Sequence, residues 1–331
     1  MSRIETIIRN LPLVLLLMLA ASMARANTLD DIATALENGQ TTEAQAMLDA
    51  LGDDATAPEV QLLQGQLWVQ TNQLDEAFEL LSQVTEARPD NADAQYWLGA
   101  AAGSLAANVS MFKAGKYARI VKRAFTRTIE IDPEYEDAYA GLISFHLQAP
   151  RIVGGSKKEA QALAEKLQTL DPLQGGLSLV DVYRQTRRED EARELLKAMA
   201  ESMPDEPRAW SSLGFQAQGD EDWETAHEAF SKGAKAGDDS LEQTRARLGA
   251  LYQVGRTAVF ANTNLEAGIE ALDDYLKADL PDGLPGKDWA HYRKGLLLEA
   301  SDNKSAALTA YTNARAITED EELLAQLGRK L

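Results

Sequence analysis

The sequence lacks cysteine altogether and contains only three histidines among its 331 residues. The absence of cysteine excludes thiol catalysis, cysteine-ligated zinc, iron–sulfur clusters and disulfide bonds. The histidines lie far apart, none of them in the metal-ligand spacing HExxH, at His146, His227 and His291. A GxSxG nucleophile motif and a DxDxDG calcium loop are also missing. We therefore expect no catalytic residue, no metal and no cofactor, and we predict that the protein is not an enzyme.

Basic residues are scarce as well, since 33 Lys and Arg stand against 52 Asp and Glu, for a formal net charge of -19. A strongly acidic surface repels the phosphates of nucleic acids and the headgroups of anionic lipids. We therefore expect no nucleic-acid partner.

Long apolar runs are missing from the chain except near its N-terminus. There, Arg3 and Arg9 precede the run LPLVLLLMLAAS (11–22), and the small-x-small pattern ARA (24–26) follows it. This order is typical of a secretory signal peptide, and the run is shorter than the roughly 20 residues that span a bilayer as a helix. We predict a signal peptide over residues 1–26 and a periplasmic or secreted mature chain, with no membrane insertion after cleavage. An uncleaved membrane anchor is the alternative.

The feature that recurs along the rest of the chain is a 34-residue period. Ala192 and Leu196 in one segment correspond to Ala226 and Phe230 in the next, each 34 residues later. A Gly-to-Ala spacing of 12 residues occurs in three places, Gly65–Ala77, Gly214–Ala226 and Gly295–Ala307. Each unit contains two amphipathic stretches with apolar residues three and four apart, joined by a polar turn, and this pattern predicts a pair of helices.

The WxxLG…A…F arrangement of residues 207–238, at this period, resembles the tetratricopeptide repeat. The resemblance implies an all-α, right-handed superhelical solenoid of about seven to eight helix-turn-helix units. It covers residues 27–331 as a single domain, with DEELLAQLGRKL (320–331) as a capping helix. A repeat protein of this kind is expected to bind a protein or peptide partner, and its oligomeric state stays open.

Three units carry extra residues, near 105–122, 149–156 and 254–264, with about ten added in the first. Insertions into repeats often form the binding surface. The first insertion overlaps a basic stretch without any acidic residue, FKAGKYARIVKRAFTR (112–127), with the cations Lys113, Lys116, Arg119, Lys122, Arg123 and Arg127. One interpretation is a solvated helix face that neutralises neighbouring acidic helices. The other is a docking patch for an acidic partner or an anionic polymer.

The second insertion, APRIVGGSKKEA (149–160), has the composition of a phosphate-binding loop, with Arg151, Gly154, Gly155, Ser156, Lys157 and Lys158. However, an amphipathic helix precedes the glycines where a phosphate loop needs a strand, and the spacing fails GxxxxGK[ST]. Ser156 and Glu159 form an S-x-x-E capping box, in which the glutamate reaches back to the serine. We predict a structural turn between two helices; a weak anion site at the helix N-terminus and nucleotide hydrolysis are the alternatives.

Residues 110–172, with QAPRIVGGS at their centre, are also similar to a group of exported proteobacterial repeat proteins with a QAPxIVGGS loop. More distantly, they resemble the tetratricopeptide component of TRAP-type periplasmic transport systems. That component is typically a lipoprotein associated with a substrate-binding protein, and this chain lacks the cysteine for a lipid anchor.

By the resemblance, the first helix of each unit lines the concave surface, where candidate binding residues are Tyr96, Arg184, Arg208, Phe215, Trp289 and Tyr292. We expect Trp97, Trp210 and His146 to pack in the core. The favoured function is a non-enzymatic interaction scaffold or adaptor of the cell envelope that holds a partner protein or peptide. The alternative is an accessory component of a periplasmic transport system that binds or relays a small ligand. A transport role predicts an enclosed apolar pocket, whereas a scaffold predicts an open groove.

Overall fold

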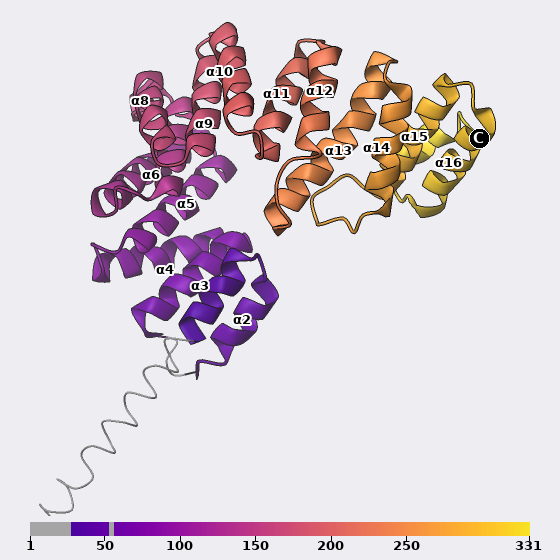
Figure 1. Cartoon of the computed structure of the whole chain (residues 1–331). Helices are drawn as coiled ribbons and strands as arrows, with labels where there is room; N and C mark the ends of the chain where they lie inside the picture. Colours follow the sequence, from indigo (N-terminus) through magenta and orange to yellow (C-terminus); the bar gives the residue numbers. More distant parts are fainter. Residues whose placement is uncertain (1–27, 53–55) are drawn as a thin grey trace, which may run out of the picture. The chain divides into compact units, whose positions relative to one another are not determined.

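The computed structural model describes residues 28–52 and 56–331, which form helices joined by turns and loops and contain no strand (Figure 1). The predicted signal peptide, residues 1–26, lies outside the described residues. In the described part of the chain, no helix is both long enough and apolar enough to span a membrane.

The helices follow one another with short connections. In chain order they are residues 28–37, α2 (Thr41–Asp49), α3 (Pro58–Gln70), α4 (Leu74–Ala87), α5 (Ala92–Asn108), α6 (Met111–Ile131), α7 (Glu136–Gln148), the 3-10 turn η2 (Arg151–Val153), α8 (Lys157–Gln168), α9 (Pro172–Gln185), α10 (Glu189–Ser202), α11 (Pro207–Gly219), α12 (Trp223–Gly233), α13 (Leu241–Ala261), α14 (Leu265–Lys277), α15 (Lys287–Ala300), α16 (Lys304–Ile317) and α17 (Glu321–Leu327).

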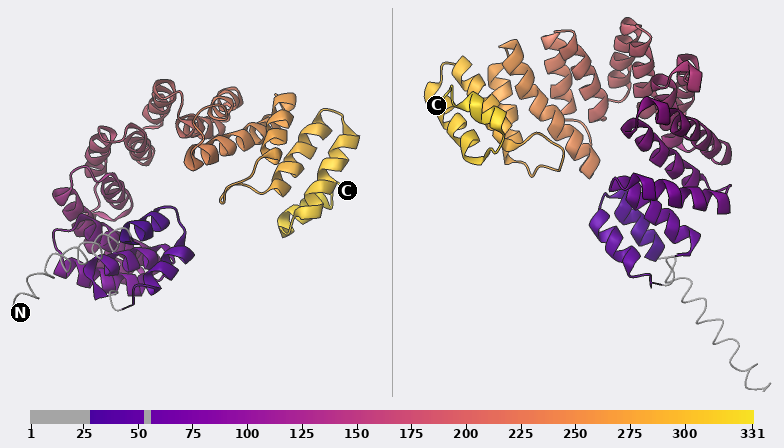
Figure 2. Two further views of the ribbon diagram at one scale, coloured as in Figure 1. Left: turned by 60° about the horizontal axis from the view of Figure 1, so that its bottom comes forward. Right: turned by 180° about the vertical axis from the view of Figure 1, so that it is seen from behind.

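The chain divides into two compact units, the first ending at Ser178 and the second covering Leu179–Leu331. In the first unit α3 packs against α4, α5 against α6, and α7 against α8; in the second, α11 packs against α12, α13 against α14, and α15 against α16. Neighbouring hairpins within a unit also touch, through α4 and α5 or through α12 and α13, for example (Figure 2). The prediction of an all-α chain built from stacked helical hairpins is confirmed, and the single continuous solenoid stays a prediction.

A glycine in the first helix of a hairpin makes room for a large side chain of the second helix. A β-carbon on Gly214 would lie 2.8 Å from the Phe230 ring. The same relationship holds between Gly65 and Leu81 and between Gly295 and Tyr311. Because protein interiors are close-packed, no β-carbon fits at these positions. The recurring glycines of the sequence are therefore the points at which the two helices of a hairpin approach each other.

The first insertion lengthens two helices and leaves this packing intact. Gly65 and Gly214 meet a side chain 16 residues later, whereas Gly99 meets Phe125, 26 residues later, at 2.7 Å. The ten added residues extend the pair to 17 residues in α5 and 21 in α6. Phe125 also fills the space beside Gly141 of α7.

The third insertion lengthens α13 to 21 residues, and the turn that follows places Asn262 and Asn264 at positive φ. The sequence analysis overlooked a second extension in this unit, the loop over residues 278–286 between α14 and α15. The hydroxyl of Tyr275 donates to the Pro285 carbonyl at 2.6 Å and holds this loop to the hairpin.

Candidate functional site

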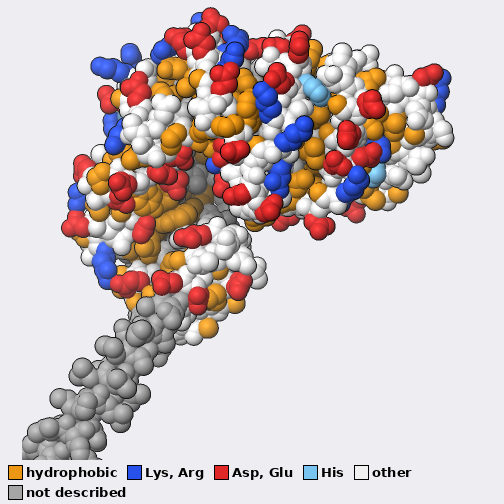
Figure 3. Space-filling view, viewed as in Figure 1, with side chains coloured by type: hydrophobic (Ala, Val, Ile, Leu, Met, Phe, Trp, Pro, Cys, Tyr) orange, Lys and Arg blue, Asp and Glu red, His pale blue; other side chains and the backbone are white. Residues whose placement is uncertain are grey.

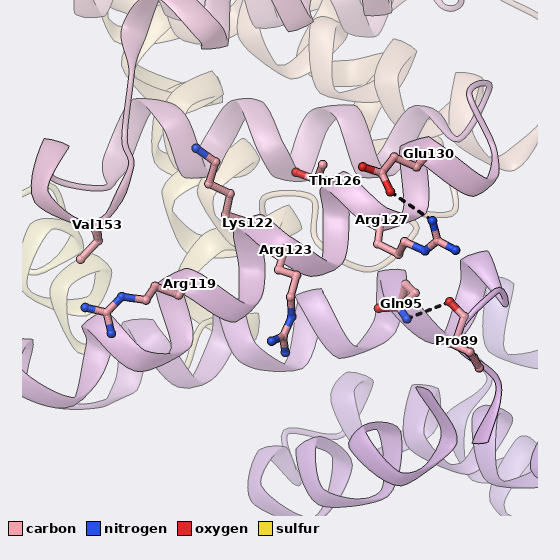
Figure 4. Close-up of a pocket in the computed structure, with 9 residues that line it drawn as sticks. All are labelled: Pro89, Gln95, Arg119, Lys122, Arg123, Thr126, Arg127, Glu130 and Val153. Carbon is pink, nitrogen blue, oxygen red and sulfur yellow. Dashed lines mark hydrogen bonds and ion pairs between the residues drawn. The ribbon is translucent and has the colours of Figure 1, made fainter. Parts of the chain in front are cut away.

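A groove of about 580 Å³ lies along α6 in the first unit (Figure 4). Its lining residues are Arg119, Lys122, Arg123, Thr126, Arg127 and Glu130 of α6, Gln95 of α5, and Pro89 and Val153 from the adjoining turns. Val153 lies at the Arg119 end of the groove and Pro89 at the Arg127 end. Four of the six cations predicted from the insertion are thus brought together in one surface.

The spacing of the cations on α6 explains their common direction. Arg119, Arg123 and Arg127 are four residues apart, so they form one row along the helix. The opposite face carries Val121 and Phe125, which are 6% exposed and belong to the core shared with α5 and α7. The helix therefore buries its apolar stripe and turns its basic stripe toward the groove.

The cations of the groove differ in their partners. Arg127 forms ion pairs with Asp90 and, at 3.1 Å, with Glu130. No carboxylate of the described residues lies within ion-pair distance of Arg119 or Arg123. The interpretation of a self-neutralised helix face therefore holds for Arg127 and fails for the other two arginines.

The glycine loop is a structural turn that follows a helix, as predicted. Gly154 has φ of 103°, in the left-handed region that favours glycine. A β-carbon on Gly155 would lie 1.8 Å from the Ala149 carbonyl oxygen. The amides of Val153 and Gly155 both donate to the Pro150 carbonyl, at 3.0 and 3.2 Å. Backbone hydrogen bonds of this kind shape the loop without a ligand.

Half of the predicted capping box is present. The Ser156 hydroxyl accepts a hydrogen bond from the Glu159 amide at 3.3 Å, so Ser156 is the N-cap of α8. The prediction that Glu159 reaches back is wrong, because the Ser156 amide donates to the His146 carbonyl at 3.1 Å. The Ser156 amide is therefore satisfied by α7 and not by the Glu159 side chain of its own helix.

The loop and the basic groove adjoin each other. The Lys122 ammonium donates to the Gly154 carbonyl at 3.5 Å, and Val153 lines the groove. The remaining predicted cations stand outside the lining, at Lys113, Lys116, Arg151, Lys157 and Lys158. The insertions near 105–122 and 149–156 therefore touch each other at one end of the groove.

His146 is a core residue, as predicted, with 4% of its surface exposed. Burial lowers the pKa of His146, and the charge of Lys122 lowers it further. The side chain is therefore neutral in the folded protein near pH 7. Over the described part of the chain, no group of His, Asp and Glu residues could hold a metal ion.

Two candidates for the concave face are arginines whose side chains already have protein partners. Arg184 donates to the Gln216 side-chain oxygen at 2.6 and 3.1 Å. Arg208 forms ion pairs with Glu206 at 3.1 Å and with Glu242 at 2.6 Å. Each guanidinium therefore already uses two of its five N–H donors in contacts within the protein.

The aromatic candidates of the second unit fall into different environments. Phe215 is 50% exposed. Trp289 is partly buried and donates from its ring nitrogen to Asp320 at 3.1 Å. Tyr292 is 8% exposed and belongs to a core cluster with Tyr311. Its assignment to a binding face is wrong, because the ring packs inside the last hairpins.

Tyr96, the candidate of the first unit, packs in a ring cluster. Its ring centroid lies 5.2 Å from Trp97, 5.7 Å from Phe125 and 5.1 Å from Tyr135. Burial, together with the charge of Asp137, raises the pKa of Tyr96 to about 12. The phenol is therefore protonated at neutral pH and contributes mainly to packing.

One position that the sequence analysis missed is Arg256. It follows Gly255 directly, as Phe215 follows Gly214, and each glycine meets a large side chain of the second helix. The register of the repeat therefore places Arg256 and Phe215 at equivalent points of their helices. Counting from the glycine would have identified this arginine from the sequence.

Comparison with known proteins agrees with the repeat. Residues 34–90 and 62–110 match the tetratricopeptide repeat family model. No curated protein matches the sequence.

Several solved structures are similar in fold. A crystal structure of MamA is 20% identical with a TM-score of 0.41, over 55% of this chain and 93% of that one. YrrB, described as a TPR protein with an unusual peptide-binding site, is 20% identical with a TM-score of 0.42, over 63% and 98%. A tetratricopeptide repeat protein from Parabacteroides merdae is 10% identical with a TM-score of 0.44, over 92% and 97%. At these identities and TM-scores the likeness does not extend to function. The match to the tetratricopeptide repeat family model thus covers residues 34–110, and hairpins in which a glycine faces a large side chain follow them along the chain.

Proposed function

We propose that this chain is a non-enzymatic scaffold that docks an acidic segment of a partner protein in the groove along α6. The observation that carries the proposal is the pair Arg119 and Arg123, which line the groove and have no carboxylate partner among the described residues. In a chain of net charge -19, whose acidic side chains are spread over the visible face of each unit (Figure 3), this groove gathers four cations, Arg119, Lys122, Arg123 and Arg127, against a single acid, Glu130. Guanidinium groups bind carboxylates through charge-assisted, often bidentate hydrogen bonds.

The shape and lining of the groove favour a scaffold over a transport accessory. A relay for a small ligand calls for an enclosed, mostly apolar pocket. The groove is lined mainly by charged side chains and is open to solvent. A second cavity, of about 290 Å³, has a mixed lining, in which Leu62, Leu63 and Val84 lie beside charged residues such as Asp30 and Arg88. The charged and open lining of the α6 groove suits the polar rim of a protein interface.

We place the protein and its partner outside the cytoplasm, in the cell envelope. This part of the proposal rests on the basic, apolar and small-residue order of residues 1–26. Cell fractionation followed by intact-mass measurement tests it. The mass of a chain that begins at Asn27, in the periplasmic fraction, is the expected result. A full-length chain in the cytoplasm would contradict the proposed location.

The docking groove is tested with the double variant Arg119→Glu/Arg123→Glu. A matched control, Lys166→Glu/Arg245→Glu, changes the net charge equally at two exposed residues outside the groove. Binding of a fluorescent decaglutamate peptide is followed by anisotropy at low and at physiological ionic strength. We expect the groove variant to lose binding and the control to retain most of it, with weaker binding at higher salt.

Crosslinking from envelope extract then compares the partners of the two variants. The proposal requires at least one acidic partner that the control captures and the groove variant does not. Identical partner sets, combined with equal decaglutamate binding by both variants, would rule out the groove as the docking site.

A further inference from the structure

Two arginines of the second unit interact electrostatically, and neither has a carboxylate within ion-pair distance among the described residues. Arg256 of α13 and Arg293 of α15 are both half-buried. Burial lowers the pKa of Arg256, and the charge of Arg293 lowers it further. Two like charges that are near each other and partly withdrawn from water repel each other and lose hydration.

The hydrogen-bond acceptors of both arginines are neutral. The Nη1 of Arg256 donates to the side-chain oxygens of Gln218 at 3.2 Å and Gln253 at 3.3 Å. The Nε of Arg293 donates to the Tyr252 hydroxyl at 2.8 Å. Among the described residues, no acceptor binds the Nη2 of Arg256 or either Nη of Arg293. Several N–H donors of the pair are therefore left for another molecule.

Several other partly buried cations of the same unit have carboxylate partners. Lys294 pairs with Asp273. Lys330 pairs with Glu299 at 2.6 Å. The chain has 52 acidic residues from which a partner for Arg256 and Arg293 could have come. Because charges withdrawn from water are normally paired, two interacting, partly buried guanidiniums with neutral acceptors are suited to an external anion.

Aromatic rings flank the two guanidinium groups. The Arg256 guanidinium lies 5.0 Å from the ring centroid of Phe260, a residue that is 54% exposed. The Arg293 guanidinium lies 5.4 Å from the ring centroids of Tyr252 and Trp289. Rings of this kind hold the guanidiniums in place by cation–π contact and present apolar surface beside them.

We propose that Arg256 and Arg293 form an anion-binding site that takes the carboxylate of a small ligand with an apolar body. The guanidinium forks match the geometry of a carboxylate. A carboxylate carries a single charge and costs less to desolvate than a phosphate dianion, and the apolar part of the ligand covers Phe260. The site lies on other helices than the α6 groove, so it is independent of the proposed docking function.

The test is calorimetric titration of the full-length protein with benzoate, acetate and inorganic phosphate. We expect benzoate to bind more tightly than acetate, because only benzoate has an apolar body, and more tightly than phosphate. Arg256→Gln and Arg293→Gln are each expected to weaken benzoate binding about tenfold, the size of a lost charge-assisted hydrogen bond. Arg245→Gln, which removes a charge from the exposed face of α13, is the control and leaves binding unchanged. The Arg119→Glu/Arg123→Glu variant should also bind benzoate as wild type does, which separates this site from the groove.

Thermal unfolding distinguishes a ligand site from a structural role of Arg256. Without ligand, we expect Arg256→Gln to melt no lower than wild type, since an uncompensated charge is removed. With benzoate, the melting temperature of wild type should rise and that of the variant should not. The proposal is overturned if benzoate does not bind, if phosphate binds more tightly, or if benzoate binding survives in both Gln variants.

Discussion

The Phe125 ring of α6 occupies the space that Gly99 of α5 leaves open, and a β-carbon on Gly99 would lie 2.7 Å from it. This contact fixes the rotation of α6 about its own axis. Because Phe125 points into the hairpin, Arg119 and Arg123 point out of it and line the groove. The same glycine contact that builds each hairpin thus sets the direction of the basic face.

Glycine packing gives the first prediction. Replacing Gly214 with Leu forces the Phe230 ring to move and overpacks the hairpin of α11 and α12. We expect the free energy of unfolding to fall by roughly 1–3 kcal/mol, measured by urea denaturation. Gly219→Leu is the control on the same helix, because nothing lies within 4 Å of a β-carbon there. If the free energy of unfolding fell equally in the two variants, the contact between Gly214 and Phe230 would not be the cause of the destabilisation.

The repeat itself could be predicted from the sequence because its signals are local. The spacing of glycine, alanine and large side chains indicates the hairpins. Gly99 and Phe125 are ten residues farther apart in the sequence than the corresponding pairs of other hairpins, which matches the predicted insertion. Ser156 was identified as an N-cap because it bonds to a residue three positions away.

Contacts between distant residues could not be predicted in the same way. Arg127 is neutralised by Asp90, which is 37 residues away in the sequence. The Ser156 amide bonds to the His146 carbonyl of the preceding helix, and the charge of Arg293 in α15 acts on Arg256 in α13. Such partners depend on how helices pack, which residue spacing along one helix does not specify.

The groove's arginines are predicted to contribute unequally. Arg123→Gln should weaken decaglutamate binding about three- to fivefold, the size of an exposed ion pair. Arg127→Gln should change it by less than about twofold, because Asp90 and Glu130 already compete for that guanidinium. Fluorescence anisotropy measures peptide binding by the two variants. Both substitutions lie on the same face of α6 and remove one positive charge. A larger effect for Arg127 would mean that its ion pairs open when the peptide binds.

The glycine loop is predicted to hold one wall of the groove. Gly155→Ala places a β-carbon 1.8 Å from the Ala149 carbonyl oxygen, so the turn must shift. Because Val153 and the Lys122 contact to Gly154 belong to the same turn, we expect decaglutamate binding to weaken along with stability. Gly103→Ala, whose β-carbon would make ordinary contact at 3.8 Å, is the control; it should leave binding unchanged and should not lower stability, because alanine favours the helix more than glycine does.

The last prediction concerns pH. Burial lowers the pKa of His146, and it also lowers that of His227 and His291. The unfolded chain takes up protons on these side chains near pH 6.5, whereas the folded chain does so only at lower pH, so the unfolded state binds more protons between the two values. Stability is therefore expected to fall as pH decreases from about 7 to about 5.

Urea denaturation at several pH values measures this slope, and His146→Gln should make it shallower by removing one of the three titrations. An unchanged slope in that variant would mean that His146 takes up its proton equally in the folded and unfolded states, and burial would then have no effect on its charge.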